Sequence, residues 1–142
     1  MEPAIHLAPG AGNNGLAAML AGLVSQNLQD NPSKRRAFLS LRGRIAIQAI
    51  DISVSLTLVF DSGRLTVYDG VVGVPDVVVR APSEHITYLS LVELDTRSGL
   101  PDPRGENTRH VINATRNGEI DVRGAASHIL LMLRLTQVMS VN

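Results

Sequence analysis

The sequence predicts an α+β fold in which helices cover one face of a five-stranded, mainly antiparallel sheet. Between residues 44 and 123, apolar side chains recur mostly at every second position, the period of a strand with one buried face. Before residue 30 and after residue 125 they recur at helical spacing instead. A sheet with one polar face is typically antiparallel, and its apolar face must be covered, here by helices from the two ends of the chain.

Composition narrows the function classes. The 142 residues have the size of one domain, and thirteen basic residues balance thirteen acidic ones, which argues against a nucleic-acid partner. The chain has no cysteine, which excludes disulfides and thiolate chemistry. No run approaches the ~20 apolar residues of a membrane span, and the first residues do not form a signal peptide. We therefore expect a cytoplasmic protein with at most transient membrane contact.

The N-terminal part predicts a flexible leader over residues 1–14 and then an apolar helix. Asn13 or Asn14 can cap this helix, which runs over residues 15–29. A second short helix contains Lys34-Arg35-Arg36, which we interpret as a solvated charged face, with a lipid headgroup contact as the alternative.

The leader also contains Gly10-Ala11-Gly12-Asn13-Asn14-Gly15, which matches the dinucleotide-binding pattern G-x-G-x-x-G. That chemistry needs a buried strand before the loop, a helix after it and a parallel strand ending in an acidic residue about 20 positions on. Only the helix is clear, so we interpret the segment as part of the leader.

Alternation defines the strands. Ile45, Ile47 and Ala49 share one face, whereas from Ile50 to Asp61 the large apolar residues occupy even positions. This switch of parity predicts a turn or bulge near residues 50–53. Further strands are expected over residues 64–69, 76–81 and 119–123.

The remaining segments predict helices and one long loop. Pro82-Ser83-Glu84 indicates a helix start with Ser83 as its cap. Residues 95–109 predict an exposed polar loop, overlapping a short helix over 108–116. The last helix, over residues 125–139, is apolar almost all round, so it must be buried, line a cavity or meet a partner.

Chemistry-bearing residues form no recognisable catalytic or metal site. His6, His85, His110 and His128 are scattered, without a paired spacing that binds zinc, and we expect exposed or capping roles for them. No G-x-S-x-G turn presents a serine nucleophile. We therefore expect no catalytic residue, metal or cofactor, and a binding function.

The order of these features resembles the sterol-carrier-protein-2 (SCP2) domain family. The resemblance covers residues 15–139. It rests on an apolar helix, a Leu-Thr-Leu-Val-Phe strand, Val-Pro-Asp-Val-Val-Val, and Gly118-Glu119-Ile120-Asp121-Val122-Arg123-Gly124 before an apolar helix. Leu41-Arg42-Gly43-Arg44-Ile45 running into the next strand looks most like the SCP2 domains of ubiquinone-biosynthesis accessory proteins. The long polar segment 95–109 departs from the family pattern.

The resemblance implies a domain over residues 15–142 that binds a fatty acyl, sterol or isoprenoid lipid, without catalysis, in a hydrophobic tunnel between sheet and helices. The alternative is an assembly module with a closed core, whose surplus apolar helix surface binds a protein partner or a second copy. The periodicity of the strands and helices, and the faces on which it places the side chains, predict these tunnel walls: Leu20, Leu23, Leu56, Leu58, Phe60, Val77, Val79, Ile129, Leu130 and Leu133.

Overall fold

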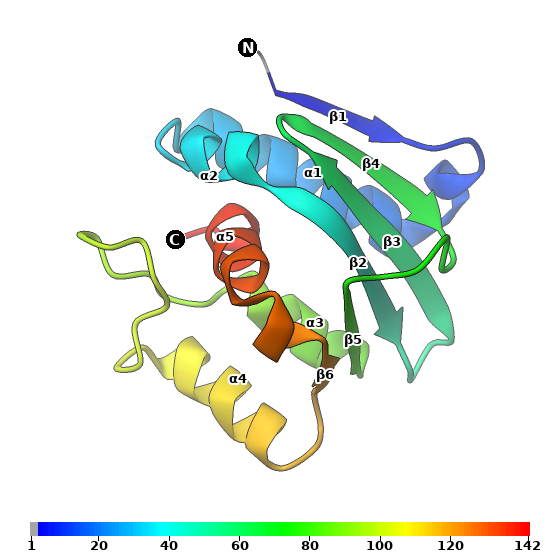
Figure 1. Cartoon of the computed structure of the whole chain (residues 1–142). Helices are drawn as coiled ribbons and strands as arrows, with labels where there is room; N and C mark the ends of the chain where they lie inside the picture. Colours follow the sequence, from blue (N-terminus) through cyan, green and yellow to red (C-terminus); the bar gives the residue numbers. More distant parts are fainter. Residues whose placement is uncertain (1–2) are drawn as a thin grey trace.

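A mixed sheet of six strands forms the framework of the chain in a computed structural model, which describes residues 3–142. Its strand order is β1-β4-β3-β2-β5-β6. The strands are β1 (Ala4–Leu7), β2 (Arg42–Ala49), β3 (Val54–Asp61), β4 (Arg64–Asp69), β5 (Val77–Ala81) and β6 (Asp121–Arg123). The α-helices, which lie on one side of the sheet (Figure 1), are α1 (Gly15–Asp30), α2 (Lys34–Ser40), α3 (Ser83–Leu89), α4 (Glu106–Arg116) and α5 (Ile129–Met139).

The alternating apolar residues form the inner face of the sheet, as predicted. Ile45 of β2 lies opposite Leu58 of β3, which in turn lies opposite Val67 of β4. On the other side of β2, Ile45 pairs with Val77 of β5. These side chains are fully buried and belong to one core cluster with residues of α1, α2 and α5. The hydrophobic core therefore lies between the sheet and the helix layer.

The predicted sheet of five mainly antiparallel strands is wrong in two respects. A sixth strand, Ala4–Leu7, pairs in parallel with β4 at the edge of the sheet. The irregular conformation expected for the leader is therefore wrong for these residues, whose short strand carries no clear alternation. In addition, β5 pairs in parallel with β2, so the sheet is mixed.

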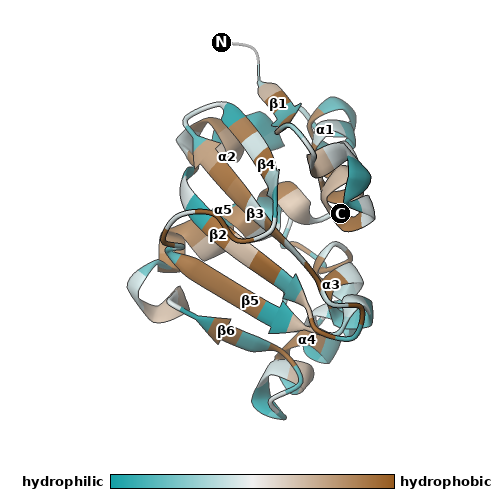
Figure 2. Ribbon diagram, turned by 90° about the vertical axis from the view of Figure 1, so that its right-hand side faces the viewer, coloured by the Kyte–Doolittle hydropathy of each residue, from teal (hydrophilic) through white to brown (hydrophobic). Residues whose placement is uncertain are grey.

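A crossover over the outer face explains the parallel pairing of β2 and β5. Residues 70–76 leave β4, cross β3 and β2, and enter β5 (Figure 2). At β3, the Thr57 hydroxyl donates to the Gly70 carbonyl at 2.7 Å and accepts the Val72 N–H at 3.1 Å. At β2, the Arg44 N–H donates to the Asp76 carboxylate, and the Asp76 N–H donates to the Arg44 carbonyl, both at 2.8 Å. The crossover thus buries Thr57, although it lies on the outer face.

The predicted turn at residues 50–53 is confirmed, because β2 ends at Ala49 and β3 begins at Val54. Ser53 takes the positive φ of 53° that glycine usually supplies. The Asp51 carboxylate accepts the Ser83 N–H and the Ser83 hydroxyl, each at 2.8 Å. These bonds lower the pKa of Asp51, led by the one from the Ser83 hydroxyl. The expectation that Ser83 caps α3 is wrong, since Pro82 holds the cap position.

The polar loop is shorter than predicted, since α4 begins at Glu106. The Glu93 carboxylate accepts the backbone N–H groups of Asn107 at 3.2 Å and Thr108 at 2.9 Å, which would otherwise be unpaired at the first turn. Burial alone raises the pKa of Glu93, but these hydrogen bonds outweigh it and the pKa is lowered. A distant carboxylate therefore fixes the start of α4.

Asn14 provides a test of how α1 is joined to the sheet. Its side chain accepts the Ala17 N–H at 3.1 Å and donates to the Ser55 carbonyl at 2.9 Å and the Asp69 carboxylate at 2.8 Å. We expect Asn14→Ala to lower the free energy of unfolding by about 2 kcal/mol, because it removes a helix cap and two bonds to the sheet. Urea unfolding measures this loss. Asn13→Ala, at the exposed neighbouring position, is the matched control, and equal losses in the two variants would contradict this role for Asn14.

Candidate functional site

The C-terminal end of α5 is held by buried polar side chains from two other helices. Asn27 of α1 donates to the carbonyls of Val138 at 2.9 Å and Met139 at 3.0 Å, and the Lys34 ammonium of α2 donates to the Ser140 carbonyl. The last carbonyls of a helix have no partner within the helix, and the helix dipole favours a cation there. These bonds therefore fasten α5 to α1 and α2.

Lys34 is the only lysine of the chain and is buried. Its interpretation as part of a solvated charged face is wrong, although Arg35 and Arg36 are exposed. Burial lowers the pKa of the Lys34 ammonium, because the charged form loses solvation.

The polar side-chain contacts at the N-terminal end of α5 are exposed. His128 occupies the cap position without forming a side-chain cap, and its Nε2 lies 3.7 Å from an oxygen of Asp76. In the second turn of α5, the Arg134 guanidinium donates to the Ser40 carbonyl at 3.2 Å. Exposed ion pairs and hydrogen bonds of this kind contribute little stability. The polar contacts of α5 are therefore buried at its C-terminal end and exposed at its N-terminal end, where Leu131 provides the packing against the core.

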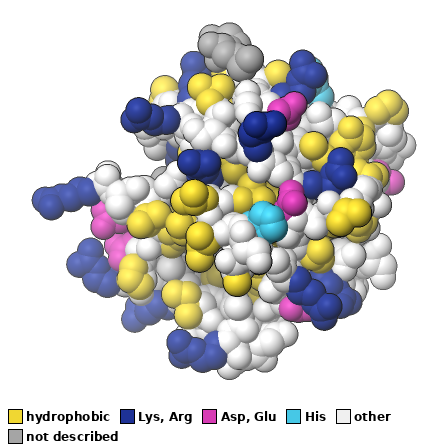
Figure 3. All heavy atoms as spheres, in the orientation of Figure 1, with side chains coloured by type: hydrophobic (Ala, Val, Ile, Leu, Met, Phe, Trp, Pro, Cys, Tyr) yellow, Lys and Arg dark blue, Asp and Glu magenta, His cyan; other side chains and the backbone are white. Residues whose placement is uncertain are grey.

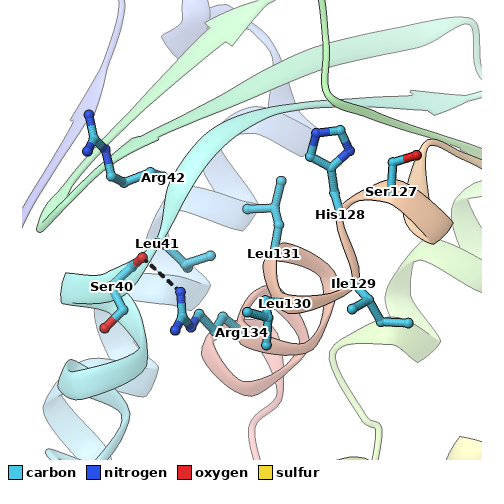
Figure 4. A pocket seen from close by; sticks show the side chains of 9 residues that line it. All are labelled: Ser40, Leu41, Arg42, Ser127, His128, Ile129, Leu130, Leu131 and Arg134. Carbon is cyan, nitrogen blue, oxygen red and sulfur yellow. Dashed lines mark hydrogen bonds between the residues drawn. The ribbon is translucent and has the colours of Figure 1, made fainter.

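A cavity of about 420 Å³ lies beside the N-terminal end of α5 (Figure 4). The side chains of Leu41, at the end of α2, and Leu131, in the first turn of α5, point into it. Its lining combines apolar, polar and cationic side chains from the end of α2, the start of β2, the turn before α5 and α5 itself, namely Ser40, Leu41, Arg42, Ser127, His128, Ile129, Leu130, Leu131 and Arg134. The volume falls within the range of about 300–1,000 Å³ that is typical of ligand sites.

A second cavity, of about 600 Å³, adjoins the first at Arg42. It lies by the start of β2 and is lined by Arg44, Val74 and Asp76 among others. The Nε atom of Arg44 is buried there without a hydrogen-bond partner. This cavity is more polar than the first, so a hydrophobic ligand fits the first better.

The predicted wall residues differ in their burial and in the cavity that they line. Those at the surface are Ile129 and Leu130, which line the first cavity, and Leu133 is partly buried. Phe60 is buried and borders the second cavity. The remaining predicted walls belong to the core or pack against it, and line neither cavity: Leu20, Leu23, Leu56, Leu58, Val77 and Val79. Sequence reasoning missed Leu41, Leu131 and Arg134 as lining residues.

A separate polar cluster joins α3 to α4. His85 Nε2 lies 3.2 Å from a carboxylate oxygen of Glu119, and His110 Nε2 lies 3.2 Å from His85 Nδ1. Tyr88 stacks on His110 with ring centroids 3.9 Å apart. The expectation of an exposed or capping role is wrong for His85, which is buried.

Within residues 3–142, no group of three or more His, Cys, Asp or Glu side chains is arranged to hold a metal ion.

The glycine pattern at residues 10–15 lies between β1 and α1. However, the next strand along the chain, β2, is not a neighbour of β1 in the sheet. Two neighbouring parallel strands joined by the helix, which a dinucleotide site needs, are therefore missing around this segment. In the part of the chain that the structure describes, no helix has the length and apolar character needed to cross a membrane.

Lys34→Met tests the anchor at the C-terminal end of α5. We expect the free energy of unfolding to fall by about 2 kcal/mol, because the Ser140 carbonyl loses its charged donor. Urea unfolding measures this fall, and Arg35→Met, at the exposed neighbouring residue, is the control.

The same variant gives a pH test. Because the pKa of Lys34 is lowered from 10.5, the unfolded chain binds more protons than the folded chain between the two pKa values. The stability of the wild type relative to Lys34→Met should therefore rise with pH across this interval and level off above 10.5. A constant difference across the interval would contradict the burial of the ammonium.

Comparison with known proteins shows that the fold is SCP2-like. The UbiJ-SCP2 ubiquinone synthesis protein aligns with a TM-score of 0.61 and 20% sequence identity over 87% of this chain and 95% of that chain. A crystal structure of sterol carrier protein 2 aligns with a TM-score of 0.51 and 14% identity over 85% of this chain and 91% of that chain. No protein-family model and no curated protein matches the sequence. At these identities the likeness concerns the fold.

Proposed function

We propose that this SCP2-like chain is a non-catalytic binding protein that holds a fatty acyl, sterol or isoprenoid tail beneath the first turn of α5. The observation that carries the proposal is the apolar wall of the first cavity, formed by Leu41 and Leu131 at a helix end whose polar side-chain contacts are exposed. The names of the two solved structures, one a ubiquinone synthesis protein and one a sterol carrier protein, support a lipid ligand.

A long tail needs more apolar surface than the cavity itself offers. In this proposal the first turn of α5 moves away from the sheet while its last turn stays bound to Asn27 and Lys34. The tail then enters between Leu41 and Leu131 and continues toward the inner face of the sheet. It contacts there the predicted walls Leu56, Leu58, Phe60, Val77 and Val79, with Leu20, Leu23 and Leu133 on the helix side.

The energy of binding comes from removing methylene groups from water. At about 0.8 kcal/mol per CH2, a buried run of about eight groups contributes about 6 kcal/mol. The walls that carry the tail are aliphatic or aromatic and make few polar contacts, so the protein distinguishes tails by length and bulk and accepts several lipid classes.

The alternative function, an assembly module, uses the same end of α5. It is favoured by Ile129 and Leu130, whose side chains are mostly exposed. In that case the apolar pair binds a protein partner or a second copy, and the core stays closed. Ligand binding and oligomeric state separate the two functions.

Ser127→Trp tests the proposed cavity. Ser127 is exposed and lines the cavity, so an indole there fills the cavity without disturbing the core. We expect the affinity for a fluorescent fatty acid or a polyprenyl quinone to fall more than about tenfold, in a fluorescence titration, because the tail competes with the indole. Ala126→Trp is the matched control, since Ala126 is exposed on the same turn and does not line the cavity.

Two results would contradict the proposal. One is equal affinity of Ser127→Trp and Ala126→Trp for every ligand tested. The other is a wild-type protein that carries no lipid in native mass spectrometry after purification from cells and binds none of the probes. A lipid-free dimer in the same spectrum would support the assembly module.

A further inference from the structure

Two neighbouring apolar side chains at the first turn of α5 face solvent. Ile129 is 61% exposed and Leu130 is 60% exposed, and both lie at the edge of the first cavity. Figure 3 shows a group of hydrophobic side chains on this face, with Lys or Arg side chains close by. Apolar surface of this kind, bordered by polar groups, marks a site of interaction with a partner or a membrane.

The border of this apolar pair is positively charged. Arg42 and Arg134 line the cavity, and none of its nine lining residues carries a carboxylate. Arg36 is exposed one helical turn before Ser40, whose hydroxyl donates to the Arg36 carbonyl at 3.0 Å.

Two carboxylates lie nearby. Asp61 is the cross-strand neighbour of Arg42, and Asp76, beside His128, already accepts the Arg44 N–H. Three arginines therefore outnumber these two acids, in a chain whose formal net charge is zero.

We propose that this surface, made of Ile129, Leu130, Arg36, Arg42 and Arg134, docks on an anionic lipid bilayer. The apolar pair enters the boundary between headgroups and acyl chains, while the arginines lie at the level of the lipid phosphates. Docking goes beyond ligand binding, because it places the mouth of the cavity against the bilayer. A lipid tail then passes between the cavity and the bilayer without crossing water.

The charges favour a bilayer over a second copy of the chain. A symmetric dimer through this surface would bring the three arginines of one copy and the three of the other into the same interface. Like charges at such an interface repel, whereas anionic headgroups neutralise all three.

Cosedimentation with phosphatidylcholine vesicles, with and without phosphatidylglycerol, tests docking. We expect binding to the vesicles that contain phosphatidylglycerol, and a decrease as sodium chloride is raised. The double variant Ile129→Ser/Leu130→Ser should lose more than about tenfold in vesicle affinity. Its matched control is Ile50→Ser/Ile52→Ser, an exposed apolar pair, 51% and 52% exposed, at the other end of β2.

Single arginine variants test the charged border. Arg36→Gln and Arg42→Gln should each weaken binding about fivefold, since one basic residue near the membrane surface contributes about 1 kcal/mol. The exposed residues Arg97 and Arg109 give the control substitutions Arg97→Gln and Arg109→Gln, which should leave binding unchanged.

Several outcomes overturn docking. They are no binding to either kind of vesicle, equal binding to both, and equal losses in the variants and their controls. A dimer in size-exclusion chromatography that Ile129→Ser/Leu130→Ser abolishes would instead assign the surface to a second copy. Fatty-acid binding measured in solution without vesicles shows separately whether the proposed ligand function holds.

Discussion

The fixed C-terminal end of α5 is the constraint on which the rest of the site depends. Asn27 and Lys34 come from two different helices and bind three successive carbonyls, those of residues 138–140. The Val141 N–H also donates to the Ser90 carbonyl, so the chain after α5 is tied to the segment after α3. In the proposed function these bonds keep the last turn of α5 in place while its first turn moves.

The first turn of α5 packs closely against the start of β2. Gly43 at the start of β2 has no side chain, and a Cβ atom there would lie only 2.8 Å from Leu131 Cδ2. The absence of this atom lets Leu131 rest against the strand and close the apolar layer. Leu41 and Leu131 line the cavity and are both buried. In the proposed function, movement of Leu131 exposes the inner face of the sheet to the ligand.

Much of the fold could be predicted because alternation in the sequence reports burial directly. The period-two residues Ile45, Leu58 and Val77 lie on the inner face, and the parity switch after Ala49 marks the hairpin. The alternation does not show which strands pair with each other. The sequence shows that the strand at Val77 is buried on one face, but not that the crossover places it parallel to β2.

The candidate site was harder to predict, because its important contacts join residues far apart in the chain. Lys34 is next to two exposed arginines in the sequence, so its burial cannot be read from its neighbours. The burial depends on its contact with the end of α5, which is far away in the chain. Asn27 gave a usable signal, since a polar residue three positions after Val24 falls on the apolar face of α1. Ile129 and Leu130 were predicted as walls from their hydrophobicity, which does not distinguish a buried side chain from one that meets a partner.

Hydrogen–deuterium exchange along α5 tests the central claim most directly, namely that its first turn opens while its last turn stays fixed. Amides of residues 132–134 should exchange at least about tenfold faster than those of 137–139, a difference of about 1.4 kcal/mol in opening free energy. Adding a fatty acid or polyprenyl quinone should slow exchange mainly in the first group. Equal exchange at both ends, unchanged by ligand, would contradict the account.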